Sequence, residues 1–309
     1  MSRIPAVLTG LCDDAAIFPP GSLPLAEAVP AHLRHLSSDY ADLVGPLVLS
    51  ASAVGELTPL VGHLAPGAVS ATVTVPAPDA IPAVLATLAA LPAVRLAALE
   101  VTLPQGLPAD EVVPALDAAL ASLPARESGE GPGEGAEPTV FVEVPRDDRR
   151  HALLTALADS PYRAKFRTGG VRAELYPDEA ELAAAIGASV AARLPFKATA
   201  GLHHAVRNTD PDTGFEQHGF LNVMLATDAA LQGAPVEELE RILADREGTS
   251  LAARVRDLPG ERAAALRAAF TSFGTCSVTD PLDELTALHL VAPGADRQGD
   301  DPTPKDDRA

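Results

Sequence analysis

The sequence predicts a (β/α)8 TIM-like barrel with extra helices before the last strand, and three observations lead to this fold class. The chain of 309 residues is 47% hydrophobic, which is enough to bury a large core. Short strand-like runs alternate with amphipathic stretches almost throughout, a rhythm typical of βα units around a parallel sheet. These runs number eight, whereas a doubly wound open sheet more often carries fewer strands.

Eight runs are expected to form parallel strands, each beside the next around the barrel. They are short, largely apolar or β-branched, and bounded by turn residues. In chain order the runs are Ala6–Leu11, Pro46–Ala51, Ser70–Val75, Leu96–Leu103, Thr139–Val144, Arg163–Thr168, Phe196–Ala200 and Thr275–Val278.

Acidic N-caps mark the start of three of the intervening helices. Asp79, Asp110 and Asp178 each precede apolar residues that recur every three or four positions. Asp178 is followed three residues later by Glu181, the spacing of a capping box. One or two further helices are expected within Pro235–Phe273, before the last strand.

The same pattern sets the expected domain organisation. Residues 1–292 are predicted to form one barrel domain, and residues 293–309, rich in Asp, Pro and Gly, a disordered acidic tail. Ser128–Glu137 is expected to be a flexible, inert acidic loop. Asn208–Gly219 follows the seventh strand and is expected to cover the mouth of the barrel, with Phe215 or His218 near the pocket.

Charge and cysteine content narrow the classes of partner. The formal net charge of −19 makes nucleic acid and anionic membrane surfaces unfavourable partners. The most apolar stretch, Ala80–Val94, is too short and too rich in proline to span a bilayer. The chain has two cysteines, too few for a disulfide scaffold, so we expect a protein of a reducing compartment, the cytoplasm. Both Cys12 and Cys276 are expected to lie in the core. The sequence is also compatible with a homo-oligomer.

Five of the charged residues on the predicted strands are candidates for a common site. In a barrel the outer side of each strand is covered by apolar helices, so charged strand residues should face the lumen or its mouth. We therefore expect them to converge at the carboxyl ends of the strands, as a catalytic site or as an ion-pair network that only fixes strand register. The five residues are Glu100, Glu143, Lys165, Arg167 and Lys197.

Lysine is scarce in this chain. Of 23 basic residues only Lys165, Lys197 and Lys305 are lysines, a composition typical of GC-rich, actinobacterial genomes. Arginine is the better structural partner for carboxylates because its guanidinium is planar and bidentate. Lysines retained on two successive strands indicate a need for an amine that can lose its proton, as an imine-forming nucleophile or a proton shuttle. Neighbouring cations are expected to lower the pKa of these amines.

Two tandem Lys-x-x-x-Gly motifs carry a family resemblance. They are Lys165-Phe-Arg-Thr-Gly169 and Lys197-Ala-Thr-Ala-Gly201, on the sixth and seventh predicted strands. The chain resembles an actinobacterial group of barrel proteins and, in these motifs, class I aldolases of the deoxyribose-phosphate aldolase type. That family has one lysine on each of these strands. The resemblance implies that Lys165 forms the imine and Lys197 assists proton transfer, and Glu100 stands where the family uses aspartate.

Further residues are candidates for substrate binding. Gly169, Gly170 and Gly201 would let the backbone approach an anion, or would only make tight turns. His203 is a candidate general acid or base. The remaining candidates for substrate contact are Asp13, Arg167, Thr168, Thr199, His204 and His218.

The histidine-rich segment after the seventh strand is a candidate metal site. Adjacent histidines on a strand end point apart, and neither a His-x-His on the first strand nor a His-Glu-x-x-His occurs. We therefore predict neither a bound metal nor another cofactor. The candidate metal ligands in this segment are His203, His204, His218, Asp210, Asp212 and Glu216.

Three functions follow as hypotheses. The first is a lyase of the aldolase type that acts on a small anionic carbonyl compound with Lys165, Lys197 and either Glu100 or Glu143. The second is a metal-dependent isomerase or lyase in which Glu100 and Glu143 hold the cation. The third is a non-catalytic barrel that binds an anion or a partner with the same groups.

Overall fold

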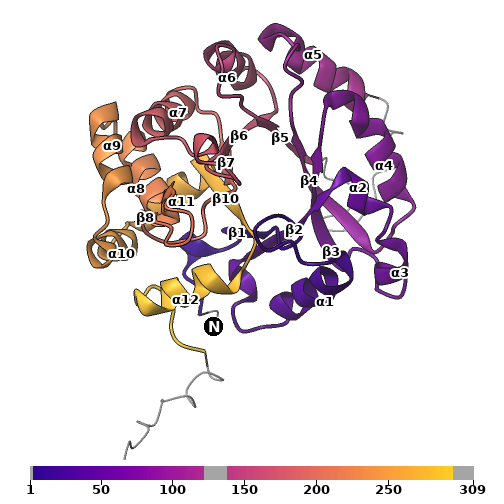
Figure 1. Ribbon diagram of the computed structural model, residues 1–309, viewed down its shortest axis with the longest axis horizontal. Helices are drawn as coiled ribbons and strands as arrows, with labels where there is room; N and C mark the ends of the chain where they lie inside the picture. The colour runs from indigo at the N-terminus through magenta and orange to yellow at the C-terminus, as the bar shows by residue number, and fades with distance from the viewer. Residues whose placement is uncertain (1–2, 122–137, 295–309) are drawn as a thin grey trace, which may run out of the picture.

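The computed structural model describes residues 3–121 and 138–294, and these fold as a closed barrel of eight parallel strands. The strands follow one another in the order β1-β10-β7-β6-β5-β4-β3-β2, and Figure 1 shows the helices as a ring around them. The predicted fold class is confirmed. The barrel strands are β1 (Cys12–Asp14), β2 (Val44–Ser50), β3 (Val69–Val75), β4 (Val94–Val101), β5 (Thr139–Glu143), β6 (Arg163–Arg167), β7 (Phe196–Thr199) and β10 (Phe270–Thr275).

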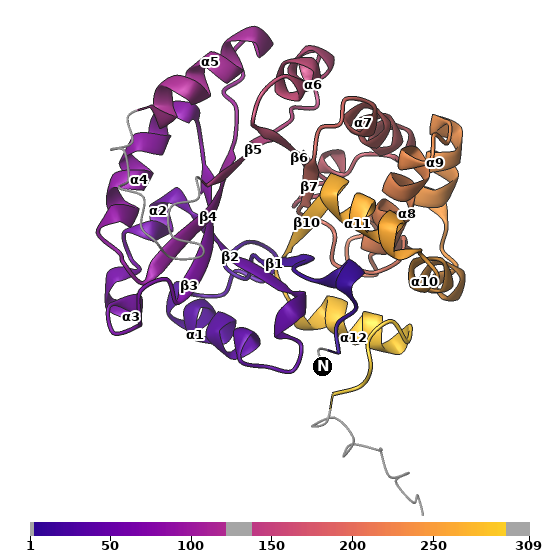
Figure 2. The ribbon, with the colours of Figure 1, turned by 180° about the vertical axis from the view of Figure 1, so that it is seen from behind.

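The helices cover the outer side of the strands, as the view from behind also shows (Figure 2). A two-stranded hairpin, β8 (Asn208–Thr209) with β9 (Glu216–Gln217), follows β7. The helices are α1 (Leu25–Leu36), α2 (Ala51–Val54), α3 (Thr58–Val61), α4 (Ile81–Ala89), α5 (Ala109–Leu120), α6 (Arg150–Ala158), α7 (Glu179–Ala191), α8 (Phe220–Leu231), α9 (Val236–Ala244), α10 (Gly248–Arg256), α11 (Gly260–Ala269) and α12 (Thr279–Ala287).

The predicted first strand is wrong. Ala6–Leu8 is a short 3-10 helix, and Gly10, at φ +59°, turns the chain before β1 begins at Cys12. Leu8 and Leu11 are fully buried, so the apolar character of Ala6–Leu11 reflects burial of a turn and not a strand. Asp13 consequently lies within β1.

The predicted last strand, Thr275–Val278, shares only its first residue with the observed β10. The segment Phe270–Thr275 forms the strand because its two aromatic rings have partners in the core. The Phe273 ring stacks on Phe220 at 4.9 Å between centroids, and the Phe270 ring lies 5.4 Å from that of Phe196. Aromatic packing here outweighs the low strand propensity of the serine between the two rings and of the glycine after Phe273.

One of the three predicted N-caps is confirmed. Asp178 caps α7, and its carboxylate accepts a hydrogen bond from the Glu181 backbone N–H at 2.8 Å. Asp110 lies inside the first turn of α5, which begins after Pro108, and Asp79 lies inside a 3-10 turn before α4. Pro108 is the N-cap of α5, whereas Pro78 is the first residue of the 3-10 turn that holds Asp79.

All residues of the segment Pro235–Phe273 are described by the structure. The segment forms three helices, α9, α10 and α11, where one or two were expected. The predicted loop Ser128–Glu137 lies outside the described residues, as does the predicted tail from residue 295 onward. Within 3–121 and 138–294, no helix has the length and apolar character needed to cross a membrane.

Candidate active site

A cavity of about 280 Å³ opens among the carboxyl ends of the barrel strands. Its floor is charged and polar, and its rim carries apolar side chains from the segment after β1 and the segment after β6. A cavity of this size suits a small molecule. The lining residues are Ala15, Phe18, Pro19, Val48, Thr74, Glu100, Thr102, Glu143, Lys165, Arg167, Gly170, Val171, Leu175, Thr199, Ala200, His203, Gly274 and Cys276.

Strand register places the two lysines side by side. Lys165 on β6 pairs with Lys197 on β7, and Glu143 on β5 pairs with Lys165. Residues paired across parallel strands point to the same side of the sheet, so these side chains all face the lumen. The Phe166 side chain, between Lys165 and Arg167, takes the opposite face and packs among helices.

Glu100 joins the two lysines. Lys165 Nζ donates to Glu100 Oε2 at 2.8 Å, and Lys197 Nζ donates to Glu100 Oε1 at 2.5 Å. One carboxylate from β4 thus bridges both amines, and all three side chains are buried. The sequence-based expectation that these residues converge agrees with this geometry.

The network continues from Lys197 toward β1. Lys197 Nζ also donates to Asp13 Oδ2, which accepts a second hydrogen bond from Ser272 Oγ on β10 at 2.8 Å. The same amine lies 5.4 Å from the centroid of the Phe141 ring. Only 1% of Lys197 is exposed, and neither it nor Asp13 is among the lining residues. Lys197 therefore lies beneath the cavity floor.

Toward the rim, the network ends at an arginine. Lys165 Nζ lies 2.9 Å from Glu143 Oε2, and Arg167 Nε donates to Glu143 Oε1 at 2.9 Å. The Arg167 side chain is 37% exposed, whereas Lys165 is 3% exposed. The guanidinium thus keeps nitrogen atoms available at the cavity while its Nε is fixed.

Burial and the alternation of charge set the protonation of these groups. Burial alone would raise the pKa of Glu100, but Lys165 and Lys197 outweigh it and lower that pKa to about 2. Burial lowers the pKa of Lys197, but Asp13 and Glu100 overcome it and hold the pKa above its ordinary value. Neighbouring cations were expected to lower the lysine pKa, and for Lys197 the interposed carboxylates reverse that expectation.

The other two carboxyl groups of the network, those of Glu143 and Asp13, have pKa values shifted in opposite directions. Glu143 has a lowered pKa, because Lys165 and Arg167 overcome the effect of its burial. Burial raises the pKa of Asp13, against the pull of Lys197. Asp13 is therefore the carboxyl group of this network that takes up a proton most readily.

Two of the three candidate glycines serve backbone packing. A Cβ on Gly169 would lie 2.6 Å from the Gly201 Cα and 2.6 Å from the Tyr176 ring, so the loops after β6 and β7 touch through their glycines. Gly201 also has φ +71°, a left-handed conformation that glycine adopts without strain. Of the three, only Gly170 lines the cavity, so the structure does not place Gly169 or Gly201 against a ligand.

The other residues predicted to contact substrate also divide into those that line the cavity and those that hold the backbone in place. Thr199 and His203 line the cavity, whereas Thr168 Oγ1 donates to the Ala200 carbonyl, which fixes the turn after β7. His204 Nδ1 lies 2.6 Å from Glu284 Oε1 on α12, and this pairing raises the pKa of His204. The carboxylate of Glu284 therefore holds the loop that carries His203.

His218 and the hairpin segment do not reach the cavity. His218 is fully buried, with Nε2 2.9 Å from the Pro177 carbonyl oxygen and Nδ1 3.2 Å from Arg207 Nη1. Phe215 packs against Tyr176, with ring centroids 5.6 Å apart. No residue of Asn208–Gly219 is among those that line the cavity, so the expectation that Phe215 or His218 lies at the pocket is wrong.

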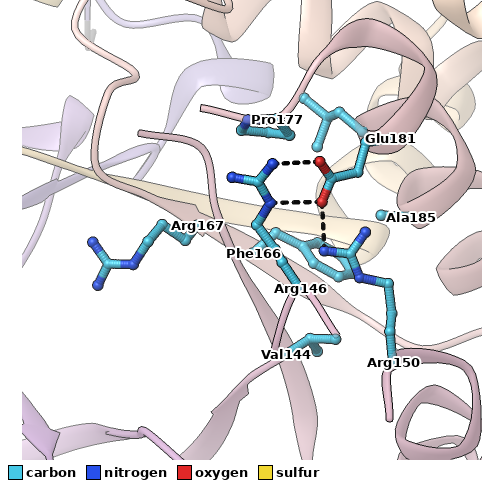
Figure 3. A pocket seen from close by; sticks show the side chains of 9 residues that line it. Val144, Arg146, Arg150, Phe166, Arg167, Pro177, Glu181 and Ala185 are labelled. Atoms are coloured by element: carbon cyan, nitrogen blue, oxygen red, sulfur yellow. Dashed lines mark hydrogen bonds and ion pairs between the residues drawn. The ribbon is translucent and has the colours of Figure 1, made fainter. Parts of the chain in front are cut away.

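A second cavity lies outside the barrel wall, between the loop after β5 and α7, and measures about 10 Å³. Figure 3 shows Arg146 and Arg150 converging on Glu181 there, while Arg167 points away from them. Arg146 binds both oxygens of Glu181, at 2.7 Å from Nε and 2.6 Å from Nη2. This space holds about one water molecule at most, so it is no substrate site.

Two residues of the site escaped prediction from sequence. Ser272, which binds Asp13, depends on the course of β10, which the sequence misplaces. Phe270 and Phe273 stand three residues apart and the register of β10 shifts between them, so period-two alternation counted from the two rings gives opposite sides for Ser272. Cys276, whose Sγ lies 3.5 Å from His203 Nδ1, lines the cavity and is only partly buried, so its predicted core position is wrong. Across 3–121 and 138–294, no group of three or more His, Cys, Asp or Glu side chains has the arrangement of a metal site.

Comparison with known proteins adds a distant structural likeness. No family model matches the chain, and no curated protein matches its sequence significantly. Among solved structures, the chain is similar to a tetrameric deoxyribose phosphate aldolase from Aeropyrum pernix, with 15% identity, a TM-score of 0.41, and coverage of 91% of this chain and 92% of that one.

Proposed function

We propose that the protein is a lyase of the aldolase type, in which Lys165 forms an imine with a small anionic carbonyl compound. The observation that carries this proposal is the position of Lys165. Its amine stands at the floor of a cavity of about 280 Å³, between two carboxylates. An amine with adjacent proton acceptors, open to a small-molecule cavity, is the arrangement that imine formation requires.

The two lysines take different roles in this proposal. Lys165 lines the cavity and is the nucleophile. Lys197 lies below it, held as an ammonium by Asp13 and Glu100, and its raised pKa makes it a poor nucleophile. Lys197 acts as a positioning residue, because it fixes the Glu100 carboxylate that contacts Lys165.

The chemistry of imine formation can be written on these groups. Lys165 transfers a proton to Glu143 or Glu100, and the free amine adds to the carbonyl carbon of the substrate. The resulting carbinolamine loses its hydroxyl group as water, with the proton returned by the same carboxyl group, and a carbon–nitrogen double bond remains. The iminium then accepts the electron pair of the bond between the substrate's α and β carbons, which becomes an enamine double bond. The β-hydroxyl group passes its proton to the carboxylate and becomes the carbonyl group of the second product.

Arg167 gives the proposal its substrate class. The partly exposed guanidinium lies at the cavity next to Lys165 and keeps donors free, because only Nε is engaged by Glu143. A planar cation of this kind recognises carboxylate or phosphate groups. The substrate is therefore expected to carry an anionic group a few bonds from its carbonyl.

The metal-dependent alternative is not favoured by the contacts. Lys165 occupies the space between Glu100 and Glu143, where a cation held by those two carboxylates would have to sit. The non-catalytic alternative uses the same groups and is distinguished by experiment. Both cysteines are free, in keeping with the proposal of a cytoplasmic protein.

Borohydride trapping tests the proposal. The protein is incubated with a panel of small aldehydes and keto acids, reduced with sodium borohydride, and mapped by peptide mass spectrometry. We expect a reduced adduct on Lys165, lost in Lys165→Met and weakened at least tenfold in Arg167→Met. Arg146→Met, which removes an arginine outside the cavity, is the matched control and should trap like the wild type.

Two outcomes would contradict the proposal. An adduct confined to Lys197 would reverse the roles of the lysines. Saturable binding of the same anions without any adduct, in a folded protein, would support the non-catalytic barrel.

A further inference from the structure

A cysteine and a histidine meet on the side of the cavity formed by β7 and β10. Cys276 follows β10 and His203 follows β7, and both line the cavity. Cys276 Sγ lies 3.5 Å from His203 Nδ1, within the range of a hydrogen bond that involves sulfur. Since β7 lies between β6 and β10 in the barrel, this pair lies next to the lysine side of the cavity.

The backbone around each residue is built to hold the pair. The chain after β7 turns through two left-handed residues, Ala200 at φ +62° and Gly201 at φ +71°. A left-handed alanine is strained, and such conformations persist where the surroundings impose them. On the other side, Gly21 approaches so closely that a Cβ there would lie 3.1 Å from Cys276 Cβ.

The direction of the hydrogen bond follows from the protonation of both groups. Burial raises the pKa of Cys276, so the sulfur keeps its proton at neutral pH. Burial lowers the pKa of His203, so the imidazole is neutral there and has a single N–H. A thiol sulfur is a weak hydrogen-bond acceptor, whereas the unprotonated nitrogen of a neutral imidazole accepts well, so the S–H donates to Nδ1.

We propose that Cys276 is a positioning residue that holds His203 with its proton on Nε2, as a neutral hydrogen-bond donor to an uncharged oxygen of the ligand. With Nδ1 occupied by the thiol, Nε2 is the ring nitrogen left for a bound molecule. The matching group is a carbonyl or hydroxyl oxygen, which accepts from a neutral N–H without needing a charge. As a contribution to catalysis this rests on the proposed function, but the hydrogen bond itself does not.

Three neighbouring titratable groups also act on the pKa of His203. His204 lowers its pKa, whereas Asp280, in the first turn of α12, and Asp210, in the hairpin segment, raise it. Burial outweighs the two aspartates, so His203 stays neutral at physiological pH. The thiol contact then selects between the two neutral tautomers.

NMR spectroscopy tests the proposal directly. Long-range proton–nitrogen correlation on 15N-labelled protein distinguishes the two neutral tautomers of histidine, and His203→Gln assigns the signals. We expect the Nε2–H tautomer in the wild type. In Cys276→Ala we expect a mixture of tautomers and a His203 pKa that moves up toward 6.5, its ordinary value. Cys276→Ser retains a donor and should restore the wild-type pattern.

The controls separate this inference from the proposed function. Cys12→Ala removes the other thiol, which is buried in β1, and should leave the His203 signals unchanged. An Nδ1–H tautomer in the wild type, or unchanged signals in Cys276→Ala, would overturn the inference. Absence of borohydride trapping in the wild type would overturn the aldolase proposal and leave the tautomer result standing.

Discussion

Two clusters of alternating charge lie near the carboxyl end of β6, and they differ in which cation they use. Outside the barrel wall, Arg146 and Arg150 share Glu181, and all three side chains are partly exposed. Inside the barrel, Lys165 and Lys197 share Glu100, and all three are buried.

The outer cluster joins the loop after β5 to α7. The guanidinium fork suits a carboxylate there, and the adjoining cavity of about 10 Å³ is too small for a substrate. The inner cluster uses compact amines in a closed lumen, one of them facing a cavity. In a chain that uses arginine almost everywhere, the two lysines within the described residues both lie in this confined lumen. Two predictions test this difference, and a third concerns the partly exposed pair His204–Glu284.

The largest effect is expected from Lys197→Met. The replacement leaves Asp13 and Glu100 buried with one cation fewer, which typically costs about 3–5 kcal/mol. The free energy of unfolding from urea denaturation should fall by that amount. Arg146→Met, in the outer cluster, should cost about 1 kcal/mol or less because its pair is partly solvated. Equal losses at both positions would remove the energetic distinction between the two clusters.

The second effect is acid sensitivity. The folded state lowers the pKa of Glu100 from 4.5 to about 2, so the unfolded state binds the proton more tightly. The stability that this provides is fully present above pH 4.5 and is lost as the pH falls toward 2, on the order of 3 kcal/mol at most. Urea denaturation at several pH values should show this slope, and Glu100→Gln should show less of it. A slope unchanged by the substitution would assign acid sensitivity to other carboxylates.

The smallest effect is expected at the loop that carries His203. The raised pKa of His204 means that its pairing with Glu284 stabilises the fold below pH 6.5 and that this stability is lost as the pH rises through the folded pKa. Both side chains are more than one third exposed, so the contribution is about 0.5 kcal/mol. Thermal unfolding of wild type and His204→Gln should differ at pH 5.5 and converge at pH 8.5. A constant difference would mean that the pairing does not depend on protonation.

The sequence predicted the middle of the barrel better than its closure. Strands β2 to β7 carry β-branched or charged residues in alternation, and period-two patterning located them to within a few residues. The first strand, Cys12-Asp13-Asp14, has no such signal, and β10 is held by Phe270 and Phe273, whose partners lie elsewhere in the chain. Strands that close a barrel owe their conformation to contacts that local sequence does not contain.

The candidate site could also be predicted only in part from the sequence. Alternation on each strand correctly put Glu100, Lys165 and Lys197 on the lumen side. It did not tell which carboxylate lies between the lysines, because that depends on register across three strands. The glycines were ambiguous for a similar reason: only the approach of Gly169 to Gly201 shows that they serve each other.

The carboxylates on either side of Lys165 have a consequence for the charge of the imine that we propose there. Glu100 and Glu143 both have lowered pKa values, and both contact the Lys165 amine. A neutral imine would leave these two carboxylates without the cation between them, which is costly in a buried site. A protonated iminium would keep a positive charge in that place. The two carboxylates would therefore favour the form of the intermediate that withdraws electrons most strongly from the bond to be broken.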